Sequence, residues 1–499
     1  MLDARKSDET ALFELGLDSL SVERAAAALP AIERGVSTYP HSARLWHVQA
    51  LLLRELGRLR DALSSFERAQ ALAPQQPKIA YGLASSRFEA GLPAVDAYAT
   101  ALQLNSGQVP VILGLAEALL AEGRAPEAML GLERLLARAP GWVAGHELLC
   151  RIRWMEGERS GFDRSFAEAI RVAPQNLDLR RAHFVALLHA KQFDILLQEI
   201  ANARSAIGHH LLFDVNEGIA LAEMGELERG ERLLAPYAEL DDITVQVRRM
   251  RLLLRSGRPE EASLIYERHA DAPDAAHLIP YASLTWRMMG DSRAVWLEGD
   301  PRLIGTYDLA DRLPPLAELA VHLRSLHRAG GQQLEQSVRG GTQTEGSLLT
   351  HIHPLIEQTS AVLRDVVRQH CEQLPSDDSR HHLLSPPRNQ PVRFAGSWSV
   401  RLHSGGHHSN HVHPMGWLSS ALYIALPAGD VSANGVEARA GWLTLGEPQA
   451  ELGLALPPFR SIEPKPGRLV LFPSTMWHGT VPFGAGERLT IAFDVASPR

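Results

Sequence analysis

The amino-acid sequence predicts a multidomain chain, in which an all-α array of repeated helical hairpins is followed by a β domain of the jelly-roll kind. Two patterns predict this division. Glycines recur about every 34 residues as far as Gly290, and short β-type runs broken by Gly and Pro begin near residue 392. The histidines also shift, because 11 of the 22 lie between residues 341 and 499.

Composition excludes several classes of protein. With 499 residues, 45% of them hydrophobic, the chain is long enough for roughly two to four packed domains. A net charge of −8 without a Lys/Arg-rich tract argues against a nucleic-acid partner. We expect no membrane span and no cleaved leader, hence a soluble protein. Cys150 and Cys371 have no CxxC spacing, which fits a reducing cytoplasm and excludes a thiolate metal cage.

Glycines in a shared local context mark the repeat. They stand between helix-type segments at Gly57, Gly91, Gly123, Gly157, Gly225, Gly257 and Gly290. Successive spacings are 34, 32, 34, 68, 32 and 33 residues, and Lys191 occupies the slot missing from the long interval. A period near 34 is typical of stacked helix–turn–helix units.

The best copy of the repeat lies between residues 43 and 74. Gly57 makes its turn, and the other signature positions hold Trp46, Ala62, Phe66, Ala69 and Pro74. Small alanines let the paired helices approach closely, while the aromatic ring fills the gap to the next unit. This pattern resembles the tetratricopeptide repeat, and we assign residues 1–295 to an array of about eight units.

Stacked units of this kind form a superhelix with an extended concave face. The resemblance implies that this face binds a peptide or protein segment. Self-association into a homo-oligomer and a purely scaffolding role are the alternatives, because a fold does not dictate function by itself.

The sequence pattern changes after residue 295. Residues 296–335 predict a connecting segment, and a helical pattern covers 347–374. Short β-type runs follow at 392–403, 417–426, 441–445, 468–472 and 488–495. These runs predict a jelly-roll domain with supporting helices over residues 336–499.

Three of the C-terminal histidines predict a metal site. His411 and His413 stand two residues apart, so on an extended backbone both imidazoles point to the same side and can bind one ion. His478 follows the run at 468–472 after a short loop that could bring it beside this pair. Because a mononuclear site uses three or four protein ligands, most other histidines are expected not to bind metal.

Arg488 opens an apolar strand soon after His478. A guanidinium in such surroundings needs an anionic partner. One candidate is a carboxylate-bearing cosubstrate, bound by Arg488 at one end while its other end chelates the metal. The alternative is a structural salt bridge with a residue such as Glu487 or Asp494.

Together these residues resemble the Fe(II)/2-oxoglutarate-dependent dioxygenases, whose motif is His-x-Asp/Glu, a distal His, and a later Arg or Lys. A more specific resemblance is to a bacterial group of 2-oxoglutarate oxygenases often found behind tetratricopeptide repeats. The segments that carry it are 336–344, 410–414, 418–423, 472–474 and 477–479. The resemblance implies a double-stranded β-helix, Fe(II) held by His411, His413 and His478, 2-oxoglutarate held by Arg488, and O2 as oxidant.

One position departs from the superfamily motif, because His413 stands where a carboxylate is usual. The bacterial group that the chain resembles has a histidine there as well. Three neutral imidazoles leave the charge of Fe(II) uncompensated until dianionic 2-oxoglutarate arrives, so we expect weaker iron binding without the cosubstrate. The alternative is that His413 stands beside the site without ligating.

Several neighbouring residues are candidates for lesser roles. Asn410 and Tyr423 could hydrogen-bond the cosubstrate, with strand-end and core packing as the alternatives. His351 and His353 also stand two residues apart, but in a predicted helix such neighbours diverge by about 200°, so we expect no metal there. The remaining histidines near the motif are expected to face solvent or substrate: His403, His407 and His408.

We therefore expect an Fe(II)- and 2-oxoglutarate-dependent dioxygenase that hydroxylates a peptide or protein side chain presented by the repeat array. Two alternatives stay open. One is a three-His, cupin-type metalloenzyme that does not use 2-oxoglutarate. The other is a non-enzymatic tetratricopeptide-repeat scaffold with a degenerate oxygenase domain.

Overall fold

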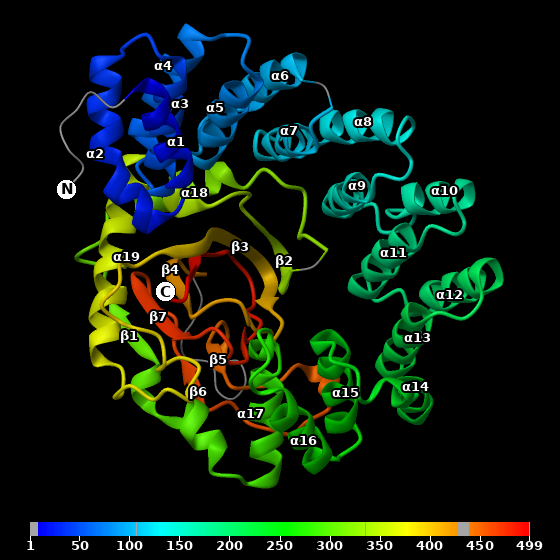
Figure 1. Cartoon of the computed structure of the whole chain (residues 1–499). Helices are drawn as coiled ribbons and strands as arrows, with labels where there is room; N and C mark the ends of the chain where they lie inside the picture. The colour runs from blue at the N-terminus through cyan, green and yellow to red at the C-terminus, as the bar shows by residue number, and fades with distance from the viewer. Residues whose placement is uncertain (1–7, 106, 335, 428–438, 499) are drawn as a thin grey trace. The chain divides into compact units, whose positions relative to one another are not determined.

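The computed structural model describes residues 8–105, 107–334, 336–427 and 439–498, so the first seven residues of the predicted array lie outside it. Its contacts divide the chain into two compact units. One comprises Met1–Gly131 with Glu345–Ser360, and the other Leu132–Thr344 with Ala361–Arg499. Figure 1 shows both and labels most of their helices and strands.

Helices occupy almost all of the chain up to residue 289, and consecutive helices pack against each other in pairs. In chain order they are α1 (Glu9–Asp18), α2 (Val22–Thr38), α3 (Ala43–Glu55), α4 (Leu59–Leu72), α5 (Pro77–Glu89), α6 (Val95–Leu104), α7 (Val109–Ala121), α8 (Ala125–Leu136), α9 (Val143–Met155), α10 (Arg164–Val172), α11 (Leu177–His189), α12 (Phe193–Ile207), α13 (Leu211–Glu223), α14 (Leu227–Leu234), α15 (Ile243–Arg255), α16 (Pro259–His269) and α17 (Ile279–Met289). The predicted all-α repeat array is confirmed.

The turns marked by the predicted period each have a left-handed residue. All seven glycines of the predicted period have positive φ angles, for example 70° at Gly57. Lys191, in the slot that lacks a glycine, has a φ of 54° and is the one non-glycine residue with positive φ in the described parts of the chain. The turn geometry therefore persists where the glycine has been replaced, although a side chain is strained there.

The signature residues of the repeat pack as expected. Ala62, Phe66 and Ala69 are fully buried. A Cβ added at Gly82 of the next unit would lie 2.3 Å from the Phe66 ring, so the aromatic side chain fills the space that this glycine leaves open. Complementary sizes at these positions hold successive units together.

Residues 345–360 return to the first unit. Thr350 donates a hydrogen bond of 2.6 Å to the Glu89 carbonyl, and the Ile352 amide donates one of 2.9 Å to the Ala90 carbonyl. The helix expected over 347–374 is shorter than predicted, because α19 runs from Pro354 to Gln373. His351 and His353 precede it, so the argument that they diverge on a helix was wrong.

Two antiparallel sheets form the β domain. Six strands are ordered β1-β7-β4-β9-β3-β2 in the larger sheet, and three are ordered β6-β5-β8 in the smaller. The strands are β1 (Gly305–Asp308), β2 (Val338–Gln343), β3 (Phe394–His408), β4 (Leu418–Ala425), β5 (Leu443–Leu445), β6 (Arg460–Ile462), β7 (Arg468–Pro473), β8 (His478–Thr480) and β9 (Arg488–Val495). Apolar side chains of both sheets share one core, which includes Leu443, Val470 and Phe472. The domain is the antiparallel double-sheet structure that the sequence predicted.

Part of the segment expected as a connection belongs to this domain. β1 pairs antiparallel with β7, with Gly305 opposite Leu471, and so forms one edge of the larger sheet. α18 (Leu316–Leu326) contacts β4. Residues 296–335 thus contribute a strand and a supporting helix.

The last repeats and the β domain share a hydrophobic core. Trp477 is buried among residues of α15 to α17, its ring centre lies 5.6 Å from that of Tyr281, and its indole N–H donates to the Pro280 carbonyl at 2.9 Å. Arg251 of α15 donates to Gln449 at 2.8 Å. Trp477 therefore connects the repeats to the loop that carries His478.

None of the described helices is both long and apolar enough to span a membrane.

Candidate active site

A backbone bridge brings His411 beside His478. The His411 amide donates to the His478 carbonyl, and the His478 amide donates back to the His411 carbonyl, both at 2.9 Å. The two ring centres consequently lie 4.1 Å apart. His478 begins β8, as the short loop after the predicted strand at 468–472 suggested.

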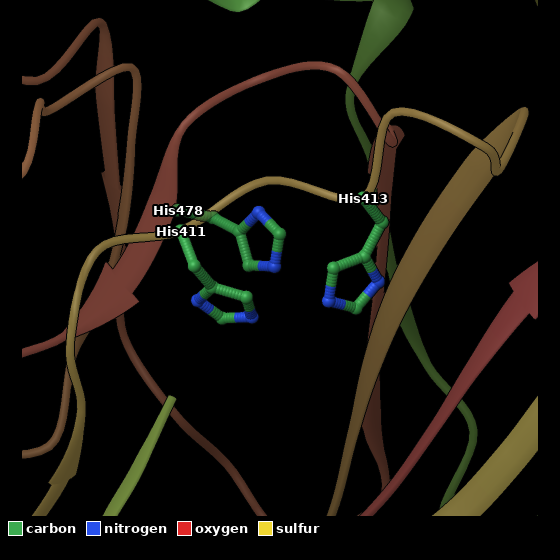
Figure 2. A group of neighbouring side chains, drawn as sticks. All are labelled: His411, His413 and His478. Atoms are coloured by element: carbon green, nitrogen blue, oxygen red, sulfur yellow. The ribbon is translucent and has the colours of Figure 1, made fainter. Parts of the chain in front are cut away.

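His413 completes a group of three imidazoles (Figure 2). Its amide donates to the Ser474 carbonyl at 2.8 Å, which ties it to the loop before His478. Its ring centre lies 5.0 Å from that of His411 and 5.1 Å from that of His478. One nitrogen of each ring lies within 4.8 Å of the other two, the only such group of potential metal ligands among the described residues.

The hydrogen bonds of the three rings assign the same tautomer to each. Nδ1 of His411 lies 2.9 Å from the Ser409 carbonyl, and Nδ1 of His478 lies 2.9 Å from the Met476 carbonyl. A carbonyl can only accept, so both Nδ1 atoms carry the proton. Nδ1 of His413 lies 2.8 Å from the Asp494 carboxylate and is a donor for the same reason.

Nε2 is therefore the nitrogen of each ring that is left to bind a metal ion, and Ser337 Oγ lies 3.2 Å from that of His411. Nitrogens about 2.1 Å from one octahedral ion would lie roughly 3 Å apart, somewhat closer than the 4.8 Å limit that the three rings satisfy. Small side-chain rotations would close that difference. Imidazole nitrogens suit iron, zinc, copper and nickel, so the donor set fits Fe(II) without selecting it.

Burial favours the neutral form of two of the three histidines. Desolvation, assisted by the neighbouring His413, lowers the pKa of His411 to about 3. Desolvation, assisted by the neighbouring His411 and His413, lowers the pKa of His478 well below its ordinary value. Neutral imidazole is the form that binds a metal ion, so protons compete little for these two ligands near neutrality.

A cavity of about 500 Å³ lies in front of the three histidines. Arg488 and Thr490 of β9 line it, and so do Arg339 and Gln343 of β2. Residues 339 and 343 flank the Gly-Gly-Thr stretch of the sequence motif. The three histidines and Arg488 thus line the same cavity.

Arg488 is buried without an acidic partner among the described residues. Its side chain is 3% exposed, Nη1 donates to the Gly441 carbonyl at 3.0 Å, and Nε has no hydrogen-bond partner in the described part of the chain. Burial lowers the pKa of the guanidinium. A buried cation with a free N–H, lining a cavity, fits an anionic ligand.

The two expected ion-pair partners of Arg488 are engaged elsewhere. Glu487 binds Arg324 at 2.7 Å and Arg401 at 2.5 Å. Asp494 binds His413. The alternative in which Arg488 forms a structural ion pair with either carboxylate was therefore wrong.

Neither Tyr423 nor Asn410 belongs to the residues that line the cavity. Tyr423 is fully buried, its hydroxyl has no partner among the described residues, and its ring centre lies 5.6 Å from the Arg488 guanidinium carbon. Asn410 donates to the Pro448 carbonyl at 2.9 Å and packs against Gly479, where an added Cβ would lie 1.9 Å from its side-chain oxygen. Tyr423 is thus a neighbour of Arg488, whereas Asn410 is not shown to contact it.

Sequence reasoning missed two contributors to the site. Asp494 faces the cavity beside His413. Ser337 lies between two histidines, with Oγ 3.0 Å from Nδ1 of His408 and 3.2 Å from Nε2 of His411. The alternation of Arg488, Thr490, Ala492 and Asp494 along β9 is the signal that could have identified Asp494, because alternate residues share one face of a strand.

The three convergent imidazoles lie on an antiparallel double-sheet domain and form a group that could hold one metal ion. The protein families that the chain matches are compatible with such a site. Residues 396–494 match the family described as "Putative 2OG-Fe(II) oxygenase", and residues 93–152 match a tetratricopeptide-repeat family. The chain therefore contains a tetratricopeptide-repeat region and a domain of this 2-oxoglutarate/Fe(II) oxygenase family.

Solved structures similar to the chain include repeat proteins. A tetratricopeptide repeat protein from Parabacteroides merdae ATCC 43184 is 16% identical, with 48% of this chain and 96% of that chain covered and a TM-score of 0.31. Yeast Tom70 is 15% identical, with coverages of 60% and 68% and a TM-score of 0.36. The search of curated proteins gives no match.

Proposed function

We propose that the β domain is an Fe(II)- and 2-oxoglutarate-dependent dioxygenase that hydroxylates a peptide or protein side chain presented by the repeat array. One observation carries the proposal. A single cavity is lined by three imidazoles, each bound through Nδ1 so that Nε2 is left to bind a metal ion, and by a buried guanidinium without an acidic partner among the described residues. A ligand that chelates a metal and ends in a carboxylate complements both groups.

Each residue has a defined part in this reaction. His411, His413 and His478 would hold Fe(II), and their Nδ1 hydrogen bonds orient them before it binds. Arg488 would bind the far carboxylate of 2-oxoglutarate, and the Tyr423 hydroxyl could donate to the same group. Bound Fe(II), 2-oxoglutarate and O2 together supply the oxidation of a substrate C–H bond.

The role of Asn410 in binding the cosubstrate stays a prediction. Its bond to the Pro448 carbonyl and its packing against Gly479 support a different contribution, since both fix the strand ends that carry His411 and His478. A cytoplasmic location is also proposed, supported by two buried, free cysteines.

Succinate formation from 2-oxoglutarate tests the activity directly. The full chain, loaded with Fe(II) under anaerobic conditions and then exposed to O2, should form succinate, and His478→Ala should not. Iron content must be measured in parallel, because turnover without a substrate can be slow. A wild-type chain that binds iron but neither binds nor consumes 2-oxoglutarate would support the cupin-type alternative, and one that binds no metal would support a scaffold.

Peptide capture tests the substrate class. Peptides retained by the full chain should gain the mass of one oxygen atom after reaction with Fe(II), 2-oxoglutarate and O2. The gain should disappear with His478→Ala, while capture itself persists because the repeats are unchanged. Captured peptides that never gain oxygen would contradict a hydroxylase acting on bound peptides.

A further inference from the structure

A carboxylate stands directly behind His413. Both oxygens of Asp494 lie within hydrogen-bond distance of Nδ1 of His413, at 2.9 Å and 2.8 Å. The side chains are 24% and 16% exposed, so the contact is largely screened from solvent. The Nδ1 atoms of His411 and His478 donate to backbone carbonyls instead. Among the three imidazoles, the one that stands in the carboxylate position of the superfamily motif is the one paired with a carboxylate.

Asp494 is itself held in place. It lies opposite Ser419 in the pairing of β4 with β9, and Ser419 Oγ lies 2.6 Å from its Oδ1. An ionised carboxylate can only accept, so this serine donates its proton to Asp494. Ser474 Oγ lies 2.9 Å from Ser419 Oγ and is left to donate to it. The backbone carbonyl of Ser474 also accepts from the His413 amide.

This arrangement changes the charge of the metal site. Three neutral imidazoles bring no charge to a divalent ion, whereas the usual two histidines and one carboxylate bring one negative charge. A carboxylate that accepts from Nδ1 polarises the ring and makes Nε2 a more basic ligand. Asp494 therefore supplies, through the His413 ring, the negative charge that the sequence motif lacks.

We propose that Asp494 is the positioning and charge-compensating residue of the metal site. It replaces the missing carboxylate ligand indirectly, because it binds the His413 ring and not the ion itself. The inference rests on the proposed function, since it requires metal at His411, His413 and His478. It revises the expectation that iron binds weakly before 2-oxoglutarate arrives, because Asp494 already offsets one charge of the ion.

Two variants separate charge from orientation. Asp494→Asn keeps an oxygen that can accept from Nδ1 of His413 but removes the charge, and Asp494→Ala removes both. The matched control is Asp308→Asn, since Asp308 is paired with Arg468 on the same sheet, outside the cavity. Thermal unfolding of each metal-free variant shows whether it folds.

Metal binding by the full chain is the measurement. Fe(II) is titrated calorimetrically without oxygen, and Co(II) by the visible absorption of its d–d bands, both without 2-oxoglutarate. We expect Asp494→Asn to weaken binding about 10- to 100-fold, as the loss of a partner of a ligating histidine typically does. Asp494→Ala should be at least as weak, and Asp308→Asn should match the wild type.

The outcomes distinguish this inference from the proposed function. Wild-type affinity in Asp494→Asn, with or without weaker binding by Asp494→Ala, would overturn the charge-compensating role. If the wild-type chain binds neither Fe(II) nor Co(II), or if His478→Ala binds them with wild-type affinity, the proposed metal site itself is contradicted, and the inference about Asp494 with it. A folded Asp494→Asn with weakened binding and an altered Co(II) spectrum supports the inference.

Discussion

Two groups of polar residues differ in how well they are paired: the three histidines, called here the metal end, and Arg488 with its neighbour Tyr423, called the Arg488 end. At the metal end, each Nδ1 atom of His411, His413 and His478 has an acceptor within 2.9 Å. At the Arg488 end, Nε of Arg488 and the Tyr423 hydroxyl are buried and have no partner among the described residues. Unpaired buried polar groups are rare in folded proteins, since each costs about 1–3 kcal/mol.

The difference suggests different roles for the two groups under the proposed function. The rings of the metal end are oriented in advance by their acceptors, so they could bind an ion with little rearrangement. The Arg488 end has a buried positive charge without an acidic partner among the described residues, which costs stability unless an anion binds. If the proposal holds, metal would bind first, because it needs only the metal end, whereas 2-oxoglutarate would gain from the metal and from Arg488 together.

Removal of a ligand should produce the largest effect. His478→Ala leaves two imidazoles, so Fe(II) and Co(II) affinity should fall by more than the roughly 100-fold that loss of a partner behind a ligand can cause. Calorimetric titration measures it. The control is His407→Ala, since that histidine on β3 does not line the cavity. Unchanged affinity after His478→Ala would mean that the metal end is wrongly located.

Loss of the guanidinium should be next in size. Arg488→Met should weaken 2-oxoglutarate binding to the metal-loaded chain by about 2–5 kcal/mol, roughly 30- to 1,000-fold or more, the usual cost of removing one partner of a buried charge pair. The metal-free variant should be no less stable than the wild type, because a buried unpaired charge disappears. Arg324→Met, which removes a cation already paired with Glu487, is the control. A large stability loss without an effect on 2-oxoglutarate would indicate a structural Arg488.

Low pH should lower the free energy of unfolding of the metal-free chain, because the pKa of buried His411 differs between the folded and unfolded states. The unfolded chain protonates His411 near pH 6.5, whereas in the folded chain burial lowers this pKa to about 3. Between these values the unfolded state binds more protons, so the free energy of unfolding falls as pH is lowered, by up to about 1.4 kcal/mol per pH unit for this residue. Urea unfolding at pH 7, 6 and 5 measures the slope, which should be shallower in His411→Gln. An equal slope in the wild type and in His411→Gln would contradict the assignment of this pH dependence to His411.

The smallest effect concerns one hydroxyl. Tyr423→Phe should weaken 2-oxoglutarate binding by about 0.5–1.5 kcal/mol, the usual net value of a hydrogen bond, without lowering stability, because this hydroxyl has no partner in the described structure to lose. Tyr307→Phe is the control. It should lower the free energy of unfolding, since the Tyr307 hydroxyl lies 3.0 Å from Nδ1 of His370, and it should leave 2-oxoglutarate binding unchanged, since Tyr307 does not line the cavity. Urea unfolding and 2-oxoglutarate titration of both variants distinguish the two cases.

Local patterns were enough to predict most of the fold. The period of 34 located the turns, including the one at Lys191, whose positive φ no residue preference would have suggested. Runs of β-type residues located β3, β4, β5, β7 and β9. Four strands were missed. β1, β6 and β8 have only three or four residues, and β2 includes Gly340 and Gly341, so none of them forms a recognisable β-type run.

The sequence predicted which three histidines come together, but not which of them pairs with Asp494. Spacing and the family resemblance singled out His411, His413 and His478, which the structure brings together. Asp494 was considered only as a partner of Arg488, because sequence does not show which of two nearby bases a carboxylate faces. The pairing of β4 with β9 decides this question, since it places Asp494 opposite Ser419 and next to His413.

Trp477 and His478 are neighbours in the chain but belong to different environments. The first is buried among α15, α16 and α17, and the second offers a nitrogen to the metal site. Any ion that binds the folded site and not the unfolded chain stabilises the whole cooperative unit, by about 2.7 kcal/mol at a concentration of 100 times its dissociation constant. Repeats in contact with Trp477 should therefore exchange their amide hydrogens more slowly when metal is bound. The availability of iron would then affect the rigidity of these repeats, although they provide none of the three histidines.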